Sequence, residues 1–426
     1  MKNKFENNLR FAKRLDHTDS LKSYRSKFFI PKMRGKPVIY FSGNSLGLQP
    51  KQANSFIQQE LKDWAGLGVD GHEHAHRPWL YYHKFSKKIL AEIVGARPKE
   101  VVAMNQLTVN LHLMMVSFYR PSTGRYKILT EAGAFSSDQY AFESQIKFHG
   151  LNPASALIEV SPRDGEFTLR TEDIIKAIEE HGHELALIIF GGVQYYTGQF
   201  FDIKKITEAG QKEGAMVGFD LAHAIGNVDL QLHRHNVDFA VWCSYKYLNS
   251  GPGGIAGAYI HEKHFDRDDL PRFAGWWGHQ EKERFDMKKG FKAITGIDGW
   301  QVSNVPVLQA AAHLASLQIF RDAGIKTLRR KSILLTDYLE YLLKEIDPFE
   351  NSYRIITPSN SKNRGCQLSI FLKKNGKKIF NSLTRNGVSL DWREPNVIRL
   401  APVPLYNTFE EVFRFVEIFK AILAKS

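Results

Sequence analysis

Residues 237–261 read VDFAVWCSYKYLNSGPGGIAGAYIH, and this stretch says most about the fold. It holds two apolar runs, 237–244 and 255–261, separated by a polar turn rich in glycine. Apolar runs that do not alternate with polar residues are typical of strands buried on both faces of a sheet. Lys246 lies two residues after the end of the first run, so we expect its amine to face a cleft at the end of a strand.

Similar apolar runs precede this stretch and alternate with helix-like segments. This alternation predicts a mostly parallel, seven-stranded α/β sheet flanked by helices. The further strands are expected at residues 100–105, 126–131, 156–160, 185–190 and 215–220, and the helices at 108–119, 171–181 and 203–213.

The pattern changes after Pro306. Long helical stretches are expected at 307–321 and 326–346, followed by short strands at 354–357 and 366–372, a helix at 377–386 and a last helix from Thr408. We therefore predict a smaller α+β domain over residues 306–426 and a large domain over 71–305. Residues 1–70 should form a helical segment that packs against both domains.

Composition excludes several classes of protein. The 426 residues carry a net charge of +13, but the basic residues are scattered, which argues against nucleic-acid binding as the main role. Apolar runs fall short of the roughly 20 residues of a membrane helix, and the N-terminus lacks the apolar core of a secretory signal. With only two cysteines, Cys243 and Cys366, a disulfide framework is not expected. We expect a cytoplasmic protein without a membrane partner.

Two charged residues at strand ends suggest chemistry. Lys246 could form a Schiff base if burial kept its amine nucleophilic, although an isolated lysine is more often an ordinary surface residue. Asp220 ends the run 215–220, where a carboxylate could pair with a protonated pyridine nitrogen. An ion pair or a helix cap is the alternative. His223, three residues later, could orient a group around a cofactor.

Two further sites follow predicted strands. Leu107 and Thr108 begin an apolar helix whose N-terminus could bind a phosphate, although a plain N-cap is the commoner role. Phe135 and Asp138 follow the run 126–131, and an aromatic ring there could stack on a flat cofactor. Each signal is weak alone. Their consistent placement just after strands favours one shared site.

Nearly the whole chain resembles kynureninases, which are pyridoxal-phosphate enzymes of fold type I close to the class V aminotransferases. The resemblance lies in YFSGNSLGLQP (40–50), GHEHAHRPW (71–79), NQLTVNLHLMM (105–115), VGFDLAHAIGN (217–227), CSYKYLNSGPGGIAG (243–257), GWWGH (275–279) and IRLAPVPLYN (398–407). It implies hydrolytic Cβ–Cγ cleavage of L-kynurenine or 3-hydroxy-L-kynurenine. The products would be anthranilate or 3-hydroxyanthranilate, plus L-alanine, in tryptophan catabolism or NAD biosynthesis by the kynurenine pathway.

The resemblance also implies roles for single residues. Lys246 would carry pyridoxal 5'-phosphate and move the proton at Cα, and Tyr245 is a further candidate for proton transfer. The cofactor would also meet these residues: Leu107 and Thr108 near the phosphate with Tyr245, Phe135 on the ring, and Asp138, Asp220 and His223 around it.

A homodimer with shared active sites is implied, because Trp276 and Asn304 match positions that reach the cofactor from the second subunit. Arg399 would bind the substrate carboxylate. His72, Ser303 and Asn304 would line the substrate ring. These three residues resemble those of kynureninases that prefer the 3-hydroxylated substrate.

The sequence departs from the family pattern at Gly191, where a serine is expected, and at Ser136, where proline is common. The histidines in HEHAH (72–76) have the alternate spacing of metal ligands on a strand, but no further ligand cluster accompanies them, and we predict no metal. The alternatives are an aminotransferase, a cysteine desulfurase or a basic scaffold without catalysis. Neither cysteine suits the mobile loop that a desulfurase needs.

Overall fold

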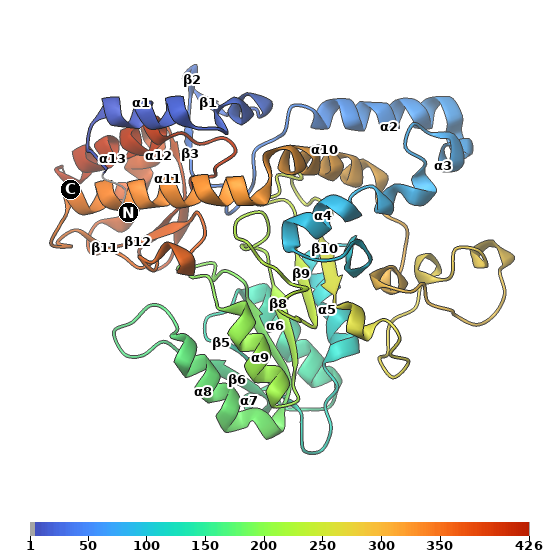
Figure 1. The fold of residues 1–426 in the computed structure, drawn as a ribbon. Coiled ribbons are helices and arrows are strands. Elements are labelled where there is room, and N and C mark those ends of the chain that lie inside the picture. Colours follow the sequence, from blue (N-terminus) through green and yellow to red (C-terminus); the bar gives the residue numbers. More distant parts are fainter. Residues whose placement is uncertain (1–4, 426) are drawn as a thin grey trace.

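A seven-stranded sheet forms the centre of the molecule (Figure 1). The computed structural model describes residues 5–425. The strands lie in the order β4 (Val101–Ala103), β10 (Gly257–Ile260), β9 (Phe239–Trp242), β8 (Met216–Asp220), β7 (Leu185–Gly191), β5 (Lys127–Glu131) and β6 (Leu157–Val160). The five strands from β9 to β6 run parallel, and β10 pairs antiparallel with both β4 and β9. The sheet predicted from the sequence is therefore confirmed.

Both faces of this sheet are covered, which explains its continuous apolar strands. Along β7, Ile188 and Phe190 belong to one hydrophobic core, whereas Leu187 and Ile189 belong to the other. The first core takes side chains from α4 (Lys87–Val94), α8 (Thr171–His181), α9 (Ile203–Lys212) and α10 (Val307–Ala323). The second takes them from α5 (Leu107–Phe118), α6 (Ser136–Phe148) and α7 (Pro153–Ala156).

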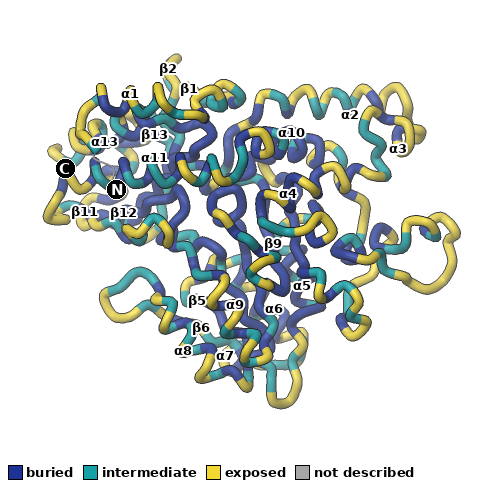
Figure 2. Tube along the Cα trace, viewed as in Figure 1, coloured by how far each residue is buried: buried dark blue, intermediate teal, exposed yellow. Residues whose placement is uncertain are grey.

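A second, four-stranded antiparallel sheet lies in the C-terminal part of the chain. Its order is β11 (Tyr353–Ile355), β12 (Leu368–Leu372), β15 (Val397–Leu400) and β14 (Asp391–Arg393). It shares a third core with α11 (Ile325–Ile346), α12 (Gly376–Arg385) and α13 (Phe409–Leu423). Buried segments accordingly concentrate around the two sheets (Figure 2).

The N-terminal segment contacts both regions. Helix α1 (Leu9–Thr18) lies against α13, and α2 (Ala53–Leu67) lies along α10 (Figure 1). Strand β3 (Ile39–Tyr40) pairs with β13 (Val388–Ser389). The domain limits remain predictions. Because α10 contributes to the core of the large sheet and most of α11 to that of the small sheet, we propose that the second limit lies between these helices.

Some elements differ from those expected. The sequence did not predict α6, β14 or β15, and the short strands β14 and β15 have too few residues for a clear alternation. His72 and His74 lie on the short helix α3 (Gly71–His74), so the strand suggested by their spacing does not form. Among the described residues, no helix is both long and apolar enough to cross a membrane.

Candidate active site

A pocket opens at the carboxyl ends of the parallel strands, where ligands of open α/β sheets bind. Glu131 ends β5, Gly191 ends β7 and Asp220 ends β8, and all three line it. The residues predicted from the sequence that line this same pocket are Leu107, Thr108, Phe135, Asp138, Asp220, His223, Tyr245 and Lys246.

Lys246 enters the pocket from the loop that follows β9. Its Nζ lies 3.1 Å from Nε2 of His223 and 5.8 Å from the ring centroids of Phe135 and Tyr245. Burial, followed by the charge of Lys246, lowers the pKa of His223 well below its usual value. The imidazole is therefore neutral at pH 7, and its Nε2 accepts a hydrogen bond from the Lys246 amine.

The N-terminal motif at residues 40–50 supports the Lys246 loop. The backbone N–H of Gly47 donates to the carbonyl oxygen of Tyr245 at 2.9 Å. A Cβ added to Gly47 would collide with the Lys246 carbonyl and with Asn249. A glycine is needed at position 47 because the two backbones approach so closely.

Three buried carboxyl groups, those of Glu131, Asp138 and Asp220, line the pocket. Burial raises the pKa of all three, and the charge of Asp220 raises the pKa of Asp138 further. The carboxyls of Asp138 and Asp220 lie close enough to share a proton. Oδ1 of Asp138 has no hydrogen-bonding partner among residues 5–425. A cation placed beside this pair would relieve the repulsion between two ionised carboxylates.

A negatively charged group can bind at two helix N-termini that meet at the pocket. Helix α5 begins at Leu107, and α6 begins directly after Phe135. The hydroxyls of Thr108 and Ser137, one from each helix, lie 2.7 Å apart. Neither helix has a side-chain cap, so backbone N–H groups of both first turns are available to an anion such as a phosphate.

Arg399 lies on β15 in the small sheet and is only 1% exposed. Its Nη1 donates to the carbonyl oxygen of Tyr195 at 2.8 Å, and Nη2 forms an ion pair with Asp391. Nε has no partner among the described residues. Because Tyr195 also lines the Lys246 pocket, its carbonyl links Arg399 to that pocket.

The remaining predicted residues lie elsewhere. His72, Trp276 and Asn304 line a second pocket, of about 410 Å³, and Ser303 is an exposed neighbour of Asn304. The Trp276 side chain is 47% exposed. Within one chain, the structure does not bring these residues to Lys246.

Curated relatives match almost the whole chain. The kynureninase of Flavobacterium psychrophilum is 55% identical over 98% of both chains, and that of Myxococcus xanthus is 54% identical over 97% of both. The kynureninase of Rattus norvegicus is 49% identical and covers 97% of this chain and 93% of its own. The chain belongs to the kynureninase family. It is therefore an enzyme, and the family description "Kynureninase C-terminal domain" matches residues 328–419.

Solved structures confirm the fold of this kynureninase family member. A cysteine desulfurase from Thermococcus onnurineus aligns with a TM-score of 0.75 at 19% identity, covering 91% of this chain and 95% of its own. The desulfurase CsdA of Escherichia coli aligns with a TM-score of 0.74 at 16% identity, covering 95% and 99%. At this identity the likeness concerns the fold, which is the type I fold of pyridoxal-phosphate enzymes.

Other pocket residues were not predicted as site residues. They are Glu131, Ser137, Val193, Tyr195, Ala222 and Cys243. For Glu131 a signal was present, because it ends a predicted strand as Asp220 does. Tyr195 gave no such signal, since its place near Arg399 depends on the packing of the small sheet against the large domain. Gly191, noted as a departure from the kynureninase pattern, also lines the pocket.

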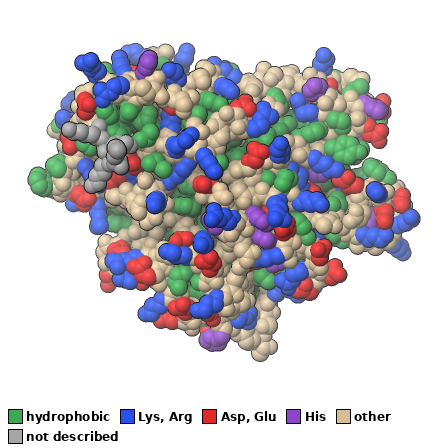
Figure 3. Space-filling view, in the orientation of Figure 1, with side chains coloured by type: hydrophobic (Ala, Val, Ile, Leu, Met, Phe, Trp, Pro, Cys, Tyr) green, Lys and Arg blue, Asp and Glu red, His purple; other side chains and the backbone are tan. Residues whose placement is uncertain are grey.

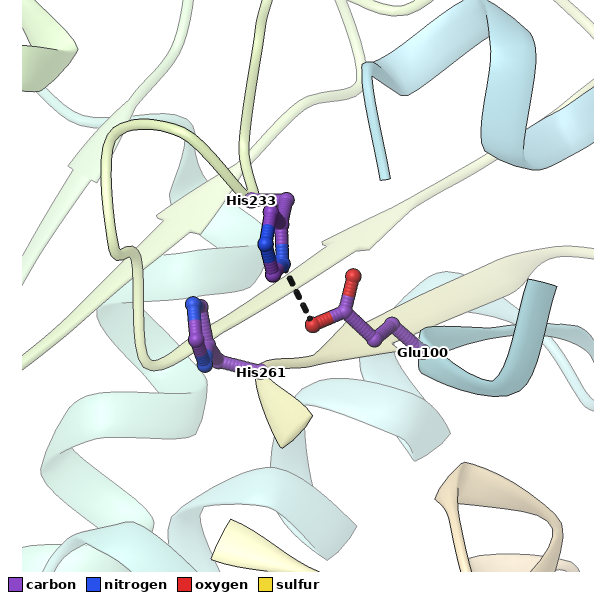
Figure 4. Close-up of side chains that lie close together, drawn as sticks. All are labelled: Glu100, His233 and His261. Carbon is purple, nitrogen blue, oxygen red and sulfur yellow. Dashed lines mark hydrogen bonds and ion pairs between the residues drawn. The ribbon is translucent and has the colours of Figure 1, made fainter. Parts of the chain in front are cut away.

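Outside the pocket, Glu100, His233 and His261 are the one described group whose donor atoms are near enough for a metal (Figure 4). The imidazole rings are stacked, with planes 9° apart, so their in-plane lone pairs do not converge on one point. Glu100 already accepts hydrogen bonds from His233 Nδ1 and from the backbone N–H groups of Arg97 and Glu262. These contacts are those of a structural cluster that fixes the end of β10.

Proposed function

We propose that this chain hydrolyses the Cβ–Cγ bond of L-kynurenine and 3-hydroxy-L-kynurenine with pyridoxal 5'-phosphate as cofactor. Anthranilate or 3-hydroxyanthranilate and L-alanine would be the products. The observation that carries the proposal is that the Lys246 amine and two adjacent buried carboxyls line one pocket. Membership of the kynureninase family supplies the reaction.

The residues of the pocket suit this cofactor. Asp138 and Asp220 provide negative charge for the pyridine nitrogen, Lys246 an amine for the aldehyde, and the N-termini of α5 and α6 a site for the phosphate. Phe135, 44% exposed at the pocket, offers a face to the ring. When bound, the cofactor supplies an electron sink for the carbanions of the reaction.

Proton transfer is assigned to two neighbouring side chains. Lys246 takes the proton from Cα and returns it, while the neutral His223 orients the Lys246 amine by their hydrogen bond. Burial raises the pKa of Tyr245 above its usual value, so the phenol keeps its proton at neutral pH. Tyr245 can therefore donate a proton during cleavage, after water has attacked the ketone.

The substrate carboxylate is assigned to Arg399. Its guanidinium is held by Asp391 and by the Tyr195 carbonyl, and a carboxylate arriving from the pocket would compete with Asp391. Asp391 also lies 3.4 Å from the guanidinium of Arg393. When the substrate displaces Asp391 from Arg399, Asp391 could therefore pair with Arg393 instead. This exchange of partners would couple substrate binding to the small sheet.

We further propose a homodimer with shared active sites. Trp276 and Asn304 lie with His72 in a pocket whose surroundings include exposed apolar side chains, Val69 at 77% and Phe285 at 60%. A partner subunit covering this surface would bury these side chains. His72, Ser303 and Asn304 would then line the substrate ring of the partner's pocket and favour the 3-hydroxylated substrate.

The last part of the proposal concerns where the enzyme acts in the cell and in which pathway. We propose a cytoplasmic enzyme of tryptophan catabolism or NAD biosynthesis, without a nucleic-acid or membrane partner. Lys and Arg are interspersed with Asp and Glu over the visible face, as is usual for a soluble enzyme surface (Figure 3).

Turnover of each kynurenine by the purified protein tests the function. We expect the aromatic acid and alanine in equal amounts, with faster turnover of 3-hydroxykynurenine. Lys246→Ala should abolish turnover. Formation of a 2-oxo acid in place of alanine would indicate an aminotransferase, and equal or faster turnover of unhydroxylated kynurenine would contradict the substrate preference.

A further inference from the structure

Glu131 is a buried carboxyl in the Lys246 pocket to which the proposed reaction gives no role. Its side chain is on the last residue of β5 and is 4% exposed. The backbone N–H of Gly191 lies 3.1 Å from Oε1 and 3.2 Å from Oε2, and the Thr130 hydroxyl donates to Oε2 at 3.3 Å. The carboxyl is thus held across the ends of two neighbouring strands, β5 and β7.

Gly191 makes room for this carboxyl. A Cβ at position 191 would lie 3.0 Å from Oε1 of Glu131, which is closer than carbon and oxygen normally approach. A side chain at 191 would therefore force the carboxyl to shift by a few tenths of an ångström. The serine expected at this position would supply a hydroxyl to the pocket, whereas this chain has the Glu131 carboxyl in direct contact with Gly191.

We propose that Glu131 is a positioning residue that sets the charge of the Asp138–Asp220 pair, and that Gly191 is what admits it. The proposal rests on the proposed function, because it assumes that this pair meets the pyridine nitrogen. Glu131 acts through the pair and does not contact the reacting atoms.

The charged groups around Glu131 come from several elements. The charge of Asp220 on β8 raises the pKa of Glu131, and the charge of Glu131 raises the pKa of Asp138 on α6, whereas the charge of Lys246 lowers the pKa of Asp138. His223 is neutral because burial lowers its pKa. Cys243 and Tyr245 also line the pocket, and burial raises the pKa of both, so neither carries charge near neutrality.

Glu131 can change charge in the range where the enzyme works. Burial, opposed by its hydrogen bonds, raises its pKa to about 7. Above that pH its negative charge would stabilise a cation in the pocket, such as a protonated pyridine nitrogen of the bound cofactor. Below it, the pair of aspartates faces a neutral neighbour.

Absorbance of the bound cofactor against pH tests this proposal in the holoenzyme. The wild-type curve should contain a step near pH 7, and Glu131→Gln should lack it. The pKa of the cofactor chromophore should also fall by about half a unit to one unit in the variant, because a stabilising negative charge is lost. Glu159→Gln, which removes an exposed carboxyl from β6, is the matched control and should leave the curve unchanged.

Gly191→Ala provides a second variant, since it keeps the carboxyl but displaces it. Its absorbance curve should shift toward that of Glu131→Gln. If Glu131→Gln does not fold, the curve of Gly191→Ala alone tests the proposal. Curves identical to wild type in both variants would overturn the proposal. In the cofactor-free wild-type protein, the infrared carbonyl band of the protonated Glu131 carboxyl should disappear as the pH rises through about 7. Glu131→Gln should show no such change. This measurement remains informative if the protein binds no pyridoxal phosphate, an outcome that would instead refute the proposed function.

Discussion

Nζ of Lys246 lies 3.1 Å from Nε2 of His223, so the hydrogen-bonding neighbour of the lysine amine is a neutral imidazole. A carboxylate in that place would form an ion pair with the lysine and favour its charged form. The imidazole instead orients the amine without adding a charge.

Replacing His223 by Phe should therefore lower kcat at least tenfold, which corresponds to about 1.4 kcal/mol of transition-state stabilisation. Removal of the hydrogen bond leaves the amine free to rotate away from Cα. His223→Gln retains a polar group and should recover part of the activity. Steady-state kinetics with 3-hydroxykynurenine measure both variants, and unchanged kcat in His223→Phe would contradict the assigned role.

Asp220→Asn should reduce kcat by about 10²- to 10³-fold, because the pyridine nitrogen loses the charge that keeps it protonated. The cofactor-free variant should be at least as stable as wild type, since the amide removes the repulsion with Asp138. Kinetics and thermal unfolding of the cofactor-free protein separate the two effects. A large loss of stability together with activity would mean that Asp220 acts mainly in folding.

Glu131 should make the stability of the cofactor-free protein depend on pH. Its folded-state pKa of about 7 lies above the unfolded value, so its contribution is complete at low pH and is lost as pH rises through 7. Between pH 6 and 8 this loss amounts to about 1.4 kcal/mol. Urea unfolding at the two pH values measures it. The change in unfolding free energy between pH 6 and pH 8 should be smaller in Glu131→Gln by that amount. An equal change in both proteins would argue against a titrating Glu131.

Arg399→Lys should raise KM about 100-fold, or about 2.7 kcal/mol, with a smaller effect on kcat. An ammonium cannot contact Tyr195, Asp391 and a substrate carboxylate as a planar guanidinium does. Arg414→Lys, at an exposed site on α13, is the matched control. If kcat fell while KM stayed constant, Arg399 would serve the chemical step and not substrate binding.

Two inactive variants should restore activity when combined, if Trp276 completes the site of the second subunit. A mixed dimer of Lys246→Ala and Trp276→Ala contains one intact site. Random assortment makes half of the dimers mixed, so co-expression should give about a quarter of wild-type activity per dimer. Sedimentation confirms the oligomer, and activity no higher than in the separate variants would show that each site lies within one chain.

Much of the site could be predicted because its residues follow strands. Asp220 ends an apolar run, Lys246 and Thr108 each come soon after one, and a largely parallel sheet brings such ends to one edge. Strand periodicity is local, so the sequence by itself determined the large sheet and the candidates along that edge.

Only the tertiary structure decided how more distant segments meet. It placed Glu131 against Gly191, joined Arg399 to the pocket through Tyr195, and put Trp276 in a different pocket from Lys246. Such contacts depend on how strands pair and how the small sheet packs on the large domain, which no local pattern encodes. For Lys246 the sequence determined the position at a strand end, and the fold determined that its neighbours are a neutral histidine and a group of buried carboxyls.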